Sequence, residues 1–143
     1  MIVLDTNVVS ELMRDEPDPQ VKQWISSQLI EKIWISAMTL LEIERGLLKL
    51  VPGATHSGLV RRFRELIDEN LSGHILPLGA QEATSSAALI DHQSRMGKPL
   101  HLADAVKVLR HLTPGALLLT RDVALLAALG DSAVNPWAAP ASN

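Results

Sequence analysis

The chain opens with MIVLDTNVVS (residues 1–10), in which an apolar run ends directly on a carboxylate. The run 2–4 predicts a short buried strand, and the apolar spacing after it predicts a helix over 6–13, capped by Thr6 or Asn7. A charge at the end of a buried strand is costly unless it is paired. Asp5 is therefore either a helix cap or part of a functional site, and the remaining sequence has to distinguish the two.

The same order of strand and helix continues along the chain. Further strands are predicted as short apolar runs, at 33–36, 74–78, 116–120 and 133–137. Apolar spacing predicts helices between them, over 21–29, 39–50, 59–67, 80–95, 102–112 and 122–129, with a loop at 51–58. The strands are continuously apolar, as in a parallel sheet that is covered on both faces. The sequence therefore predicts an α/β fold, a three-layer α/β/α sandwich with a short, mostly parallel sheet.

Length and composition fit one domain. Of the 143 residues, 47% are hydrophobic, and we expect a single domain over 1–137 with a frayed tail over 138–143. The absence of cysteine excludes disulfides and thiolate metal sites. A formal net charge of −3 excludes nucleic-acid binding by bulk positive charge and leaves a local basic patch or bound cations. No apolar run approaches the about 20 residues that span a bilayer, so we expect a cytoplasmic protein without a membrane partner.

Four acidic residues stand where a strand or loop gives way to the start of a helix. They are Asp5, Glu42, Asp104 and Asp122. Ligands of parallel sheets bind outside the carboxyl ends of the strands, so these side chains can converge at one edge. Helix capping is the competing explanation, because Thr39 and Glu42 match a capping box and Asp122 can cap the helix that follows it. Asp104 fits capping least well, since its neighbours in LADAV are apolar.

Converging carboxylates have a chemical consequence. Their charges repel and raise their pKa values unless a cation neutralises them. Oxygen ligands without cysteine favour Mg²⁺ or Mn²⁺, and such ions bind phosphate oxygens and promote displacement at phosphorus. The pattern therefore indicates metal-dependent phosphoryl chemistry, most simply the hydrolysis of a phosphodiester.

Several stretches resemble the motifs of PIN domains, in the same order along nearly the whole chain. IVLDTNVVSEL is similar to the opening strand with its Asp and Thr/Ser-Asn, and SAMTLLEIERGL to the second motif, with Glu42 as its acid. LADAV resembles the third motif and LLLTRDVALL the fourth, with Asp104 and Asp122 as their acids, and VNPW resembles the close of the domain. A PIN domain of this length resembles a VapC-type toxin of a type II toxin–antitoxin pair, in the FitB-like branch.

The resemblance implies a PIN-like sandwich and a Mg²⁺- or Mn²⁺-dependent endoribonuclease that acts on RNA. It also implies a homodimer and a small DNA-binding antitoxin that caps the toxin's groove, places a basic side chain in the acidic pocket and allows a larger assembly. The residues that it assigns are the catalytic acids Asp5, Glu42, Asp104 and Asp122, the metal ligands Asp5, Asp104 and Asp122 among them, and the polar supports Asn7 and Thr120.

Basic residues depart from the family's pattern after the third motif, where DAVKVLRHL replaces the usual small residues. Lys107 either faces outward or contacts RNA or a partner, and Arg45 and Arg121 are further candidates for RNA or antitoxin contact. The basic cluster at 61–64 is more readily explained as a solvated helix face.

Other functions remain as alternatives to a nuclease. A haloacid-dehalogenase-type phosphatase also begins with a strand that ends on aspartate, but it needs a second aspartate where this chain has Asn7. A non-catalytic, receiver-like module needs paired acids after the first strand and a lysine after a late one, where this chain has Arg121 and Asp122. A homologue that only binds an antitoxin is the third alternative.

Overall fold

The computed structural model describes residues 1–109 and 115–138, and in it five parallel strands form one sheet. The order across the sheet is β3-β2-β1-β4-β5. The strands are β1 (Ile2–Leu4), β2 (Ile33–Ser36), β3 (Ile75–Leu76), β4 (Leu117–Leu119) and β5 (Ala133–Val134). The predicted parallel sheet is thus confirmed. The end of the predicted helix 102–112 and residues 139–143 of the predicted tail lie outside the described residues.

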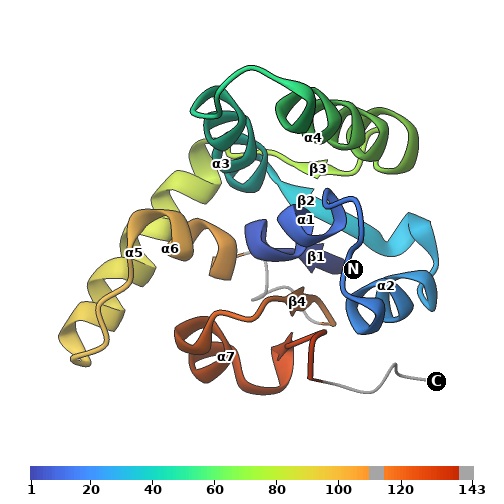
Figure 1. Ribbon diagram of the computed structural model, residues 1–143. Coiled ribbons are helices and arrows are strands. Elements are labelled where there is room, and N and C mark those ends of the chain that lie inside the picture. The colour runs from blue at the N-terminus through green and yellow to red at the C-terminus, as the bar shows by residue number, and fades with distance from the viewer. Residues whose placement is uncertain (110–114, 139–143) are drawn as a thin grey trace.

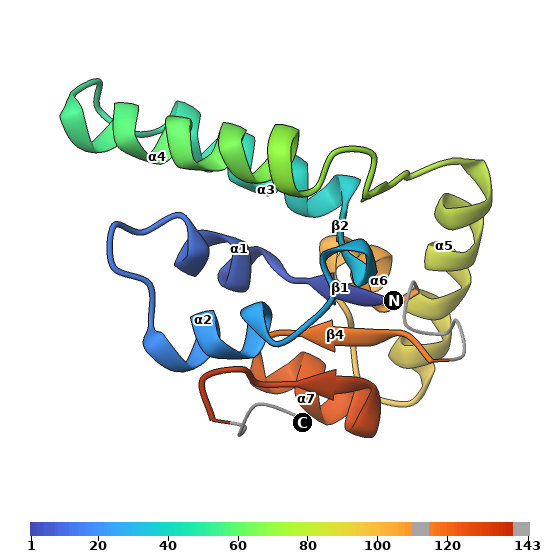
Figure 2. The same ribbon diagram turned by 90° about the vertical axis from the view of Figure 1, so that its right-hand side faces the viewer.

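The first strand lies in the middle of the sheet, because the chain crosses over between parallel neighbours. Ile2 pairs with Ile33 of β2 on one side and with Leu117 of β4 on the other, so the three strands end level with one another. Figure 2 shows β1 and β4 side by side, with the chain passing from β1 directly into α1. Whatever follows these strands in the sequence is therefore brought to one edge of the sheet.

Alternation along the strands divides the core into two parts. Ile2, Leu4 and Leu119 are buried in a larger cluster on one face, whereas Val3 and Leu118 are buried in a smaller cluster on the other. The helices that supply the larger cluster are α1 (Thr6–Leu12), α2 (Pro19–Ser26), α3 (Ala37–Leu48) and α4 (Ala54–Glu65). Those that pack on the smaller one are α5 (Ala80–Arg95), α6 (Leu102–Leu109) and α7 (Val123–Leu129). Figure 1 shows the strands between these two groups of helices, which confirms the three-layer sandwich.

Several helix bounds differ from the predicted ones. The helix predicted over 21–29 begins at Pro19, capped by Asp18, and ends at Ser26, which leaves Leu29 exposed. The loop predicted at 51–58 is shorter, because α4 already begins at Ala54. Short 3₁₀ segments at Ile30–Lys32 and Gly130–Ser132 and a π-helical turn at Leu66–Asn70 complete the described elements. None of the helices in the described part of the chain is long and apolar enough to cross a membrane.

Two adjacent leucines on α3 test the assignment of its faces. Leu47 is buried, with 6% of its surface exposed, whereas Leu48 is 85% exposed. We expect Leu47→Ala to lower the free energy of unfolding by about 2 kcal/mol or more, because it removes buried methyl groups and leaves a cavity. We expect Leu48→Ala to change it by less than about 0.5 kcal/mol. Urea unfolding followed by circular dichroism measures both, and equal losses in the two variants would contradict the assignment.

Candidate active site

The carboxyl ends of β1, β2 and β4 meet at one edge of the sheet, and polar side chains follow each of them. Asp5 comes directly after β1, Glu42 lies on the helix after β2, and Thr120 and Asp122 follow β4. Helix α6 packs against both α3 and α7 and brings Asp104 to the same edge. The predicted convergence of these segments is therefore what the topology produces.

Asp5 is both the cap of α1 and the centre of this edge. Its side chain is almost fully buried, and each carboxylate oxygen accepts two bonds. Oδ1 accepts from the backbone N–H of Thr6 at 2.7 Å and from the Lys107 ammonium at 2.9 Å. Oδ2 accepts from the Thr120 hydroxyl at 2.7 Å and from the Asn7 amide at 3.2 Å. The cap predicted at Thr6 or Asn7 is thus wrong by one or two residues, because the carboxylate itself takes the first free N–H of the helix.

Asn7 and Thr120 form a clip between the ends of β1 and β4. The Asn7 amide donates to Thr120 Oγ1 at 3.2 Å, and its carbonyl oxygen accepts from the backbone N–H of Arg121 at 3.3 Å. Thr120 Oγ1 also accepts from the backbone N–H of Asp122 at 3.0 Å. These bonds fix the plane of the Asp5 carboxylate and place Asp122 beside it. A preorganised carboxylate is what a metal or catalytic site requires.

The Lys107 side chain extends from α6 into the acidic edge, by which we mean the carboxyl edge of the sheet with Asp5, Glu42, Asp104 and Asp122. Its ammonium lies 2.9 Å from Asp5 Oδ1 and 2.8 Å from Glu42 Oε1, and only 8% of its side chain is exposed. The prediction that Lys107 faces outward is wrong, because the side chain turns inward to these two carboxylates, and its contact with RNA or a partner stays a prediction. Neither composition nor motif spacing indicates that Lys107 binds Asp5 and Glu42. The signal that could have found it is the position of Lys107 one turn after Asp104, which places both residues on one face of the helix.

Glu42 is held by side chains and does not cap a helix. Helix α3 begins at Ala37 with Ser36 as its cap, so the capping box predicted for Thr39 and Glu42 is wrong. Thr39 instead donates its backbone N–H to Ser36 Oγ at 3.1 Å. Glu42 Oε1 accepts from the Thr6 hydroxyl at 3.0 Å in addition to its bond to Lys107. The Glu42 side chain therefore joins α3 to α1 and α6 and does not cap the start of α3.

Asp122 combines the two roles that the sequence left open. Its Oδ1 accepts from the backbone N–H groups of Ala124 and Leu125, at 2.9 and 3.1 Å, and so caps α7 as predicted. Its charge also acts on Asp104, because it raises the pKa of that carboxyl. Asp122 thus caps α7 and also contributes its negative charge to the acidic edge.

The charges of the edge act on one another. Burial raises the pKa of Asp104, and the negative charges of Asp122 and Asp5 raise it further, against the opposing attraction of Lys107. Burial alone would lower the pKa of Lys107, but the charge of Asp5 and the bonds to Glu42 and Asp5 outweigh burial and raise it. Lys107 is therefore charged at neutral pH. The one ammonium contacts Asp5 and Glu42, and its attraction does not cancel the effects of burial, Asp122 and Asp5 on the pKa of Asp104.

This excess of negative charge and the oxygen donors fit a hard divalent cation, such as Mg²⁺ or Mn²⁺. The fit is incomplete in this arrangement. Within residues 1–109 and 115–138, no three carboxylate or histidine side chains lie close enough together to hold one metal ion. Both carboxylate oxygens of Asp5 already accept hydrogen bonds, and Glu42 is bonded to Lys107. The chemistry of the site therefore suits one cation on the side of Asp104 and Asp122, and the side of Glu42 is held by an ammonium.

The other predicted contact residues lie at or outside the rim of this edge. Arg121 is exposed, and its guanidinium stacks over the Trp137 ring, 4.6 Å from the ring centroid. Arg45 is exposed on α3. In the cluster at 61–64, Arg62 is only 21% exposed and pairs with Asp15 at 2.7 Å, so this residue is not part of a solvated face.

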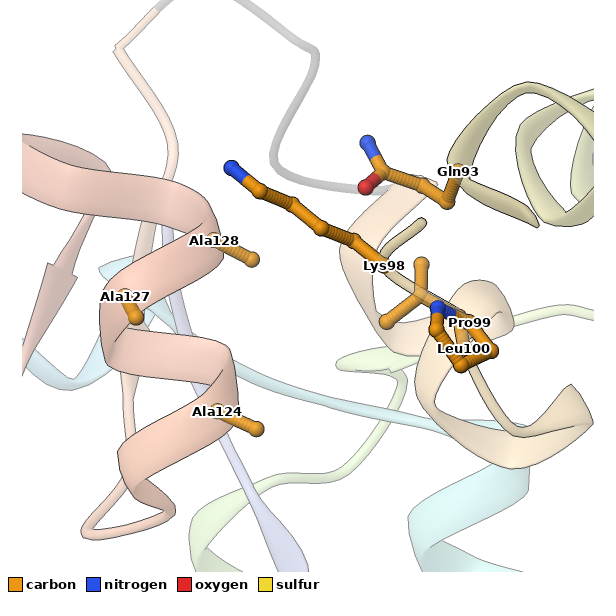
Figure 3. Close-up of a pocket in the computed structure, with 7 residues that line it drawn as sticks. All are labelled: Gln93, Lys98, Pro99, Leu100, Ala124, Ala127 and Ala128. Atoms are coloured by element: carbon orange, nitrogen blue, oxygen red, sulfur yellow. The ribbon is translucent and has the colours of Figure 1, made fainter. Parts of the chain in front are cut away.

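One cavity opens at the edge, and another lies between neighbouring helices. A groove of about 290 Å³ runs between α1, α3 and α4; it begins at Glu42 and Thr6 and is lined beyond them by apolar residues, among them Met13, Ile43, Leu50 and Leu59. The second cavity, of about 280 Å³, lies between α7 and the segment that joins α5 to α6. Figure 3 shows three alanines of α7 facing Leu100 and the Lys98 side chain across it. The first cavity is continuous with the acidic edge, and the carboxylates of the edge do not line the second.

Comparison with known proteins identifies the family of this chain. The family model for the PIN domain matches residues 2–128. VapC ribonuclease Y4jK of Sinorhizobium fredii is 35% identical over 137 residues, which cover 96% of this chain and 98% of the relative. Toxin FitB of Neisseria gonorrhoeae is 31% identical over 137 residues, with coverage of 96% and 99%. The solved structure of FitAB bound to an IR36 DNA fragment superposes with a TM-score of 0.83 at 31% identity, over 96% of each chain.

The chain therefore belongs to the PIN-domain family, as the sequence motifs indicated. Its similarity to the VapC and FitB relatives extends over almost the full length of both partners in each comparison.

The raised pKa of Asp104 predicts an effect on stability. The folded protein holds this proton more tightly than the unfolded chain, whose carboxyl titrates near 3.8, so the charge of Asp104 costs stability as the pH rises above that value. We expect Asp104→Asn to raise the Tm of the protein in EDTA at pH 7, and the gain to shrink toward pH 4. The control is Asp68→Asn, at an exposed position on the π-helical turn. An unchanged or lower Tm for Asp104→Asn at pH 7, measured by differential scanning fluorimetry, would contradict the raised pKa of Asp104.

Proposed function

We propose that this protein is the toxin of a type II toxin–antitoxin pair and a Mg²⁺- or Mn²⁺-dependent endoribonuclease, with residues 1–137 as a single nuclease domain. The proposal is supported by the placement of four acidic residues on four separate segments at the carboxyl edge of a PIN-family sheet, where the charges of Asp5 and Asp122 act on Asp104. The S. fredii relative is named as a VapC ribonuclease, which supports RNA as the substrate.

The catalytic acids in this proposal are Asp5, Glu42, Asp104 and Asp122. Asp104 and Asp122 would hold the divalent cation, with Asp5 at the margin of its site. When bound, the cation supplies a water-derived nucleophile near neutral pH and neutralises charge on the phosphate. Asn7 and Thr120 support the site by holding the Asp5 carboxylate in a fixed plane.

Positive charge at the rim would position the RNA backbone. Arg121 stacks on Trp137 and follows the clip at the end of β4, so its guanidinium is oriented while it remains exposed. Arg45 is exposed on the same helix as Glu42. Guanidinium groups in such positions bind phosphate well because they offer several donors in one plane.

The proposed partner is a small DNA-binding antitoxin, and the proposed assembly is a homodimer that joins it in a larger complex. The solved FitAB structure contains DNA and supports a partner of this kind. The apolar groove between α1, α3 and α4 begins at Glu42, so a segment bound there would reach the acidic edge. An apolar groove of this kind suits an amphipathic helix.

Cleavage of RNA tests the proposal. We expect the purified protein to cut RNA in Mg²⁺ or Mn²⁺ and EDTA to stop it. We expect Asp104→Asn to reduce the rate at least about a hundredfold, since it removes a carboxylate from the charge that the reaction needs. Because the same variant is expected to be more stable in EDTA, unfolding would not explain the loss. Gel electrophoresis of a labelled RNA measures the rate.

The matched control is Asp68→Asn, which makes the same chemical change at an exposed position outside the edge and should cut at the wild-type rate. Cleavage that persists in EDTA, or a wild-type rate for Asp104→Asn, would contradict the assignment. A short neighbouring gene for a DNA-binding protein would support the toxin assignment, and we expect its product to bind the protein and suppress cleavage, which distinguishes a toxin from a ribonuclease without an antitoxin.

A further inference from the structure

The positively charged ammonium of Lys107 lies between two carboxylates of the acidic edge. Its ammonium bridges two carboxylates from different helices and strands, Asp5 after β1 and Glu42 on α3, at 2.9 and 2.8 Å. Its side chain is 8% exposed, so most of it is out of contact with water. A lysine is rarely buried to this extent without such partners. The contact is therefore part of the built site and not a surface ion pair.

The hydrogen bonds of Asp5 show what Lys107 competes with. A carboxylate offers about four lone-pair positions, and the four donors to Asp5 fill that number. A metal ion that binds Asp5 must therefore displace one of them. The Thr6 N–H belongs to the backbone of α1, and Asn7 and Thr120 are bonded to each other. The Lys107 ammonium, on a flexible four-carbon stem, is the donor that a metal would have to replace.

We propose that Lys107 is a resident counter-cation, which holds Asp5 and Glu42 together in place of a divalent ion and limits the site to one weakly bound metal ion beside Asp104 and Asp122. The inference rests on the proposed function only in naming the metal that Lys107 opposes. Through Lys107, the chain itself carries part of the positive charge of its active site.

Two electrostatic consequences follow from this arrangement. With Lys107 in place, a divalent ion is repelled by the ammonium and finds Asp5 and Glu42 already occupied, so its affinity is low. Without Lys107, two carboxylates face each other with no counter-charge at their contact, so the metal-free protein loses stability and gains affinity for metal. When the charge of Lys107 is removed, the stability of the metal-free protein must fall and the affinity for metal must rise.

Binding of Mn²⁺ alone tests the proposal, measured by the loss of the free-ion signal in electron paramagnetic resonance. The variant Lys107→Met keeps the length of the side chain and removes its charge. We expect the wild type to bind one Mn²⁺ per chain and Lys107→Met to bind Mn²⁺ at least about tenfold more tightly, or about 1.4 kcal/mol. We expect its Tm in EDTA to lie below that of the wild type, and Mn²⁺ to raise its Tm by more than it raises that of the wild type.

Two further variants separate position from charge. Lys107→Arg keeps the positive charge and should bind Mn²⁺ as weakly as the wild type. Lys22→Met makes the same change of net charge at an exposed position on α2 and should leave Mn²⁺ binding unchanged. Affinity in Lys107→Met that is equal to or below the wild-type value would overturn the proposal. Two ions bound per wild-type chain would also overturn it, and this result does not depend on any variant folding.

Failure of this inference and failure of the proposed function are distinguishable. If Lys107→Met binds Mn²⁺ no more tightly while the wild type still cuts RNA, the inference is wrong and the nuclease assignment stands. If the variant binds Mn²⁺ as expected while the wild type cuts no RNA, the nuclease assignment is wrong and the inference stands.

Discussion

The buried Asp5 carboxylate joins the parts of this molecule that form its acidic edge. One of its oxygens caps α1 and binds α6 through Lys107, and the other binds Thr120 at the end of β4. Lys107 extends the connection to Glu42 on α3. Since Asp5 follows the central strand, elements on both faces of the sheet are fixed relative to one side chain. The position of β1 between β2 and β4 is what makes this connection possible.

Such a cluster exists only if its charges are balanced. Carboxylates brought together repel, and the pKa of Asp104 is raised first by its burial and then by the negative charges of Asp122 and Asp5. The chain balances part of the charge with its own ammonium, which satisfies Asp5 and Glu42. Lys107 therefore supplies positive charge at the two carboxylates that lie nearest to it, Asp5 and Glu42.

The parallel sheet and the placement of two of the acids at its edge could be predicted from the sequence. Continuous apolar runs identify the buried strands, and the parallel order brings Asp5 and Asp122 to one edge. Two features could not be predicted in this way. A capping box is a local pattern, so Thr39 and Glu42 matched it although Ser36 begins the helix. The direction of the Lys107 side chain depends on how α6 packs against α3, and this contact between distant segments leaves no mark in local spacing.

The position of bound metal tests the account most directly. Crystals grown with Mn²⁺ would locate the ion by its anomalous scattering, and the same map would show the Lys107 side chain. We expect one Mn²⁺ beside Asp104 and Asp122, with the Lys107 ammonium still bonded to Asp5 and Glu42. Two ions at the edge, or one ion between Asp5 and Glu42 with Lys107 displaced, would contradict it.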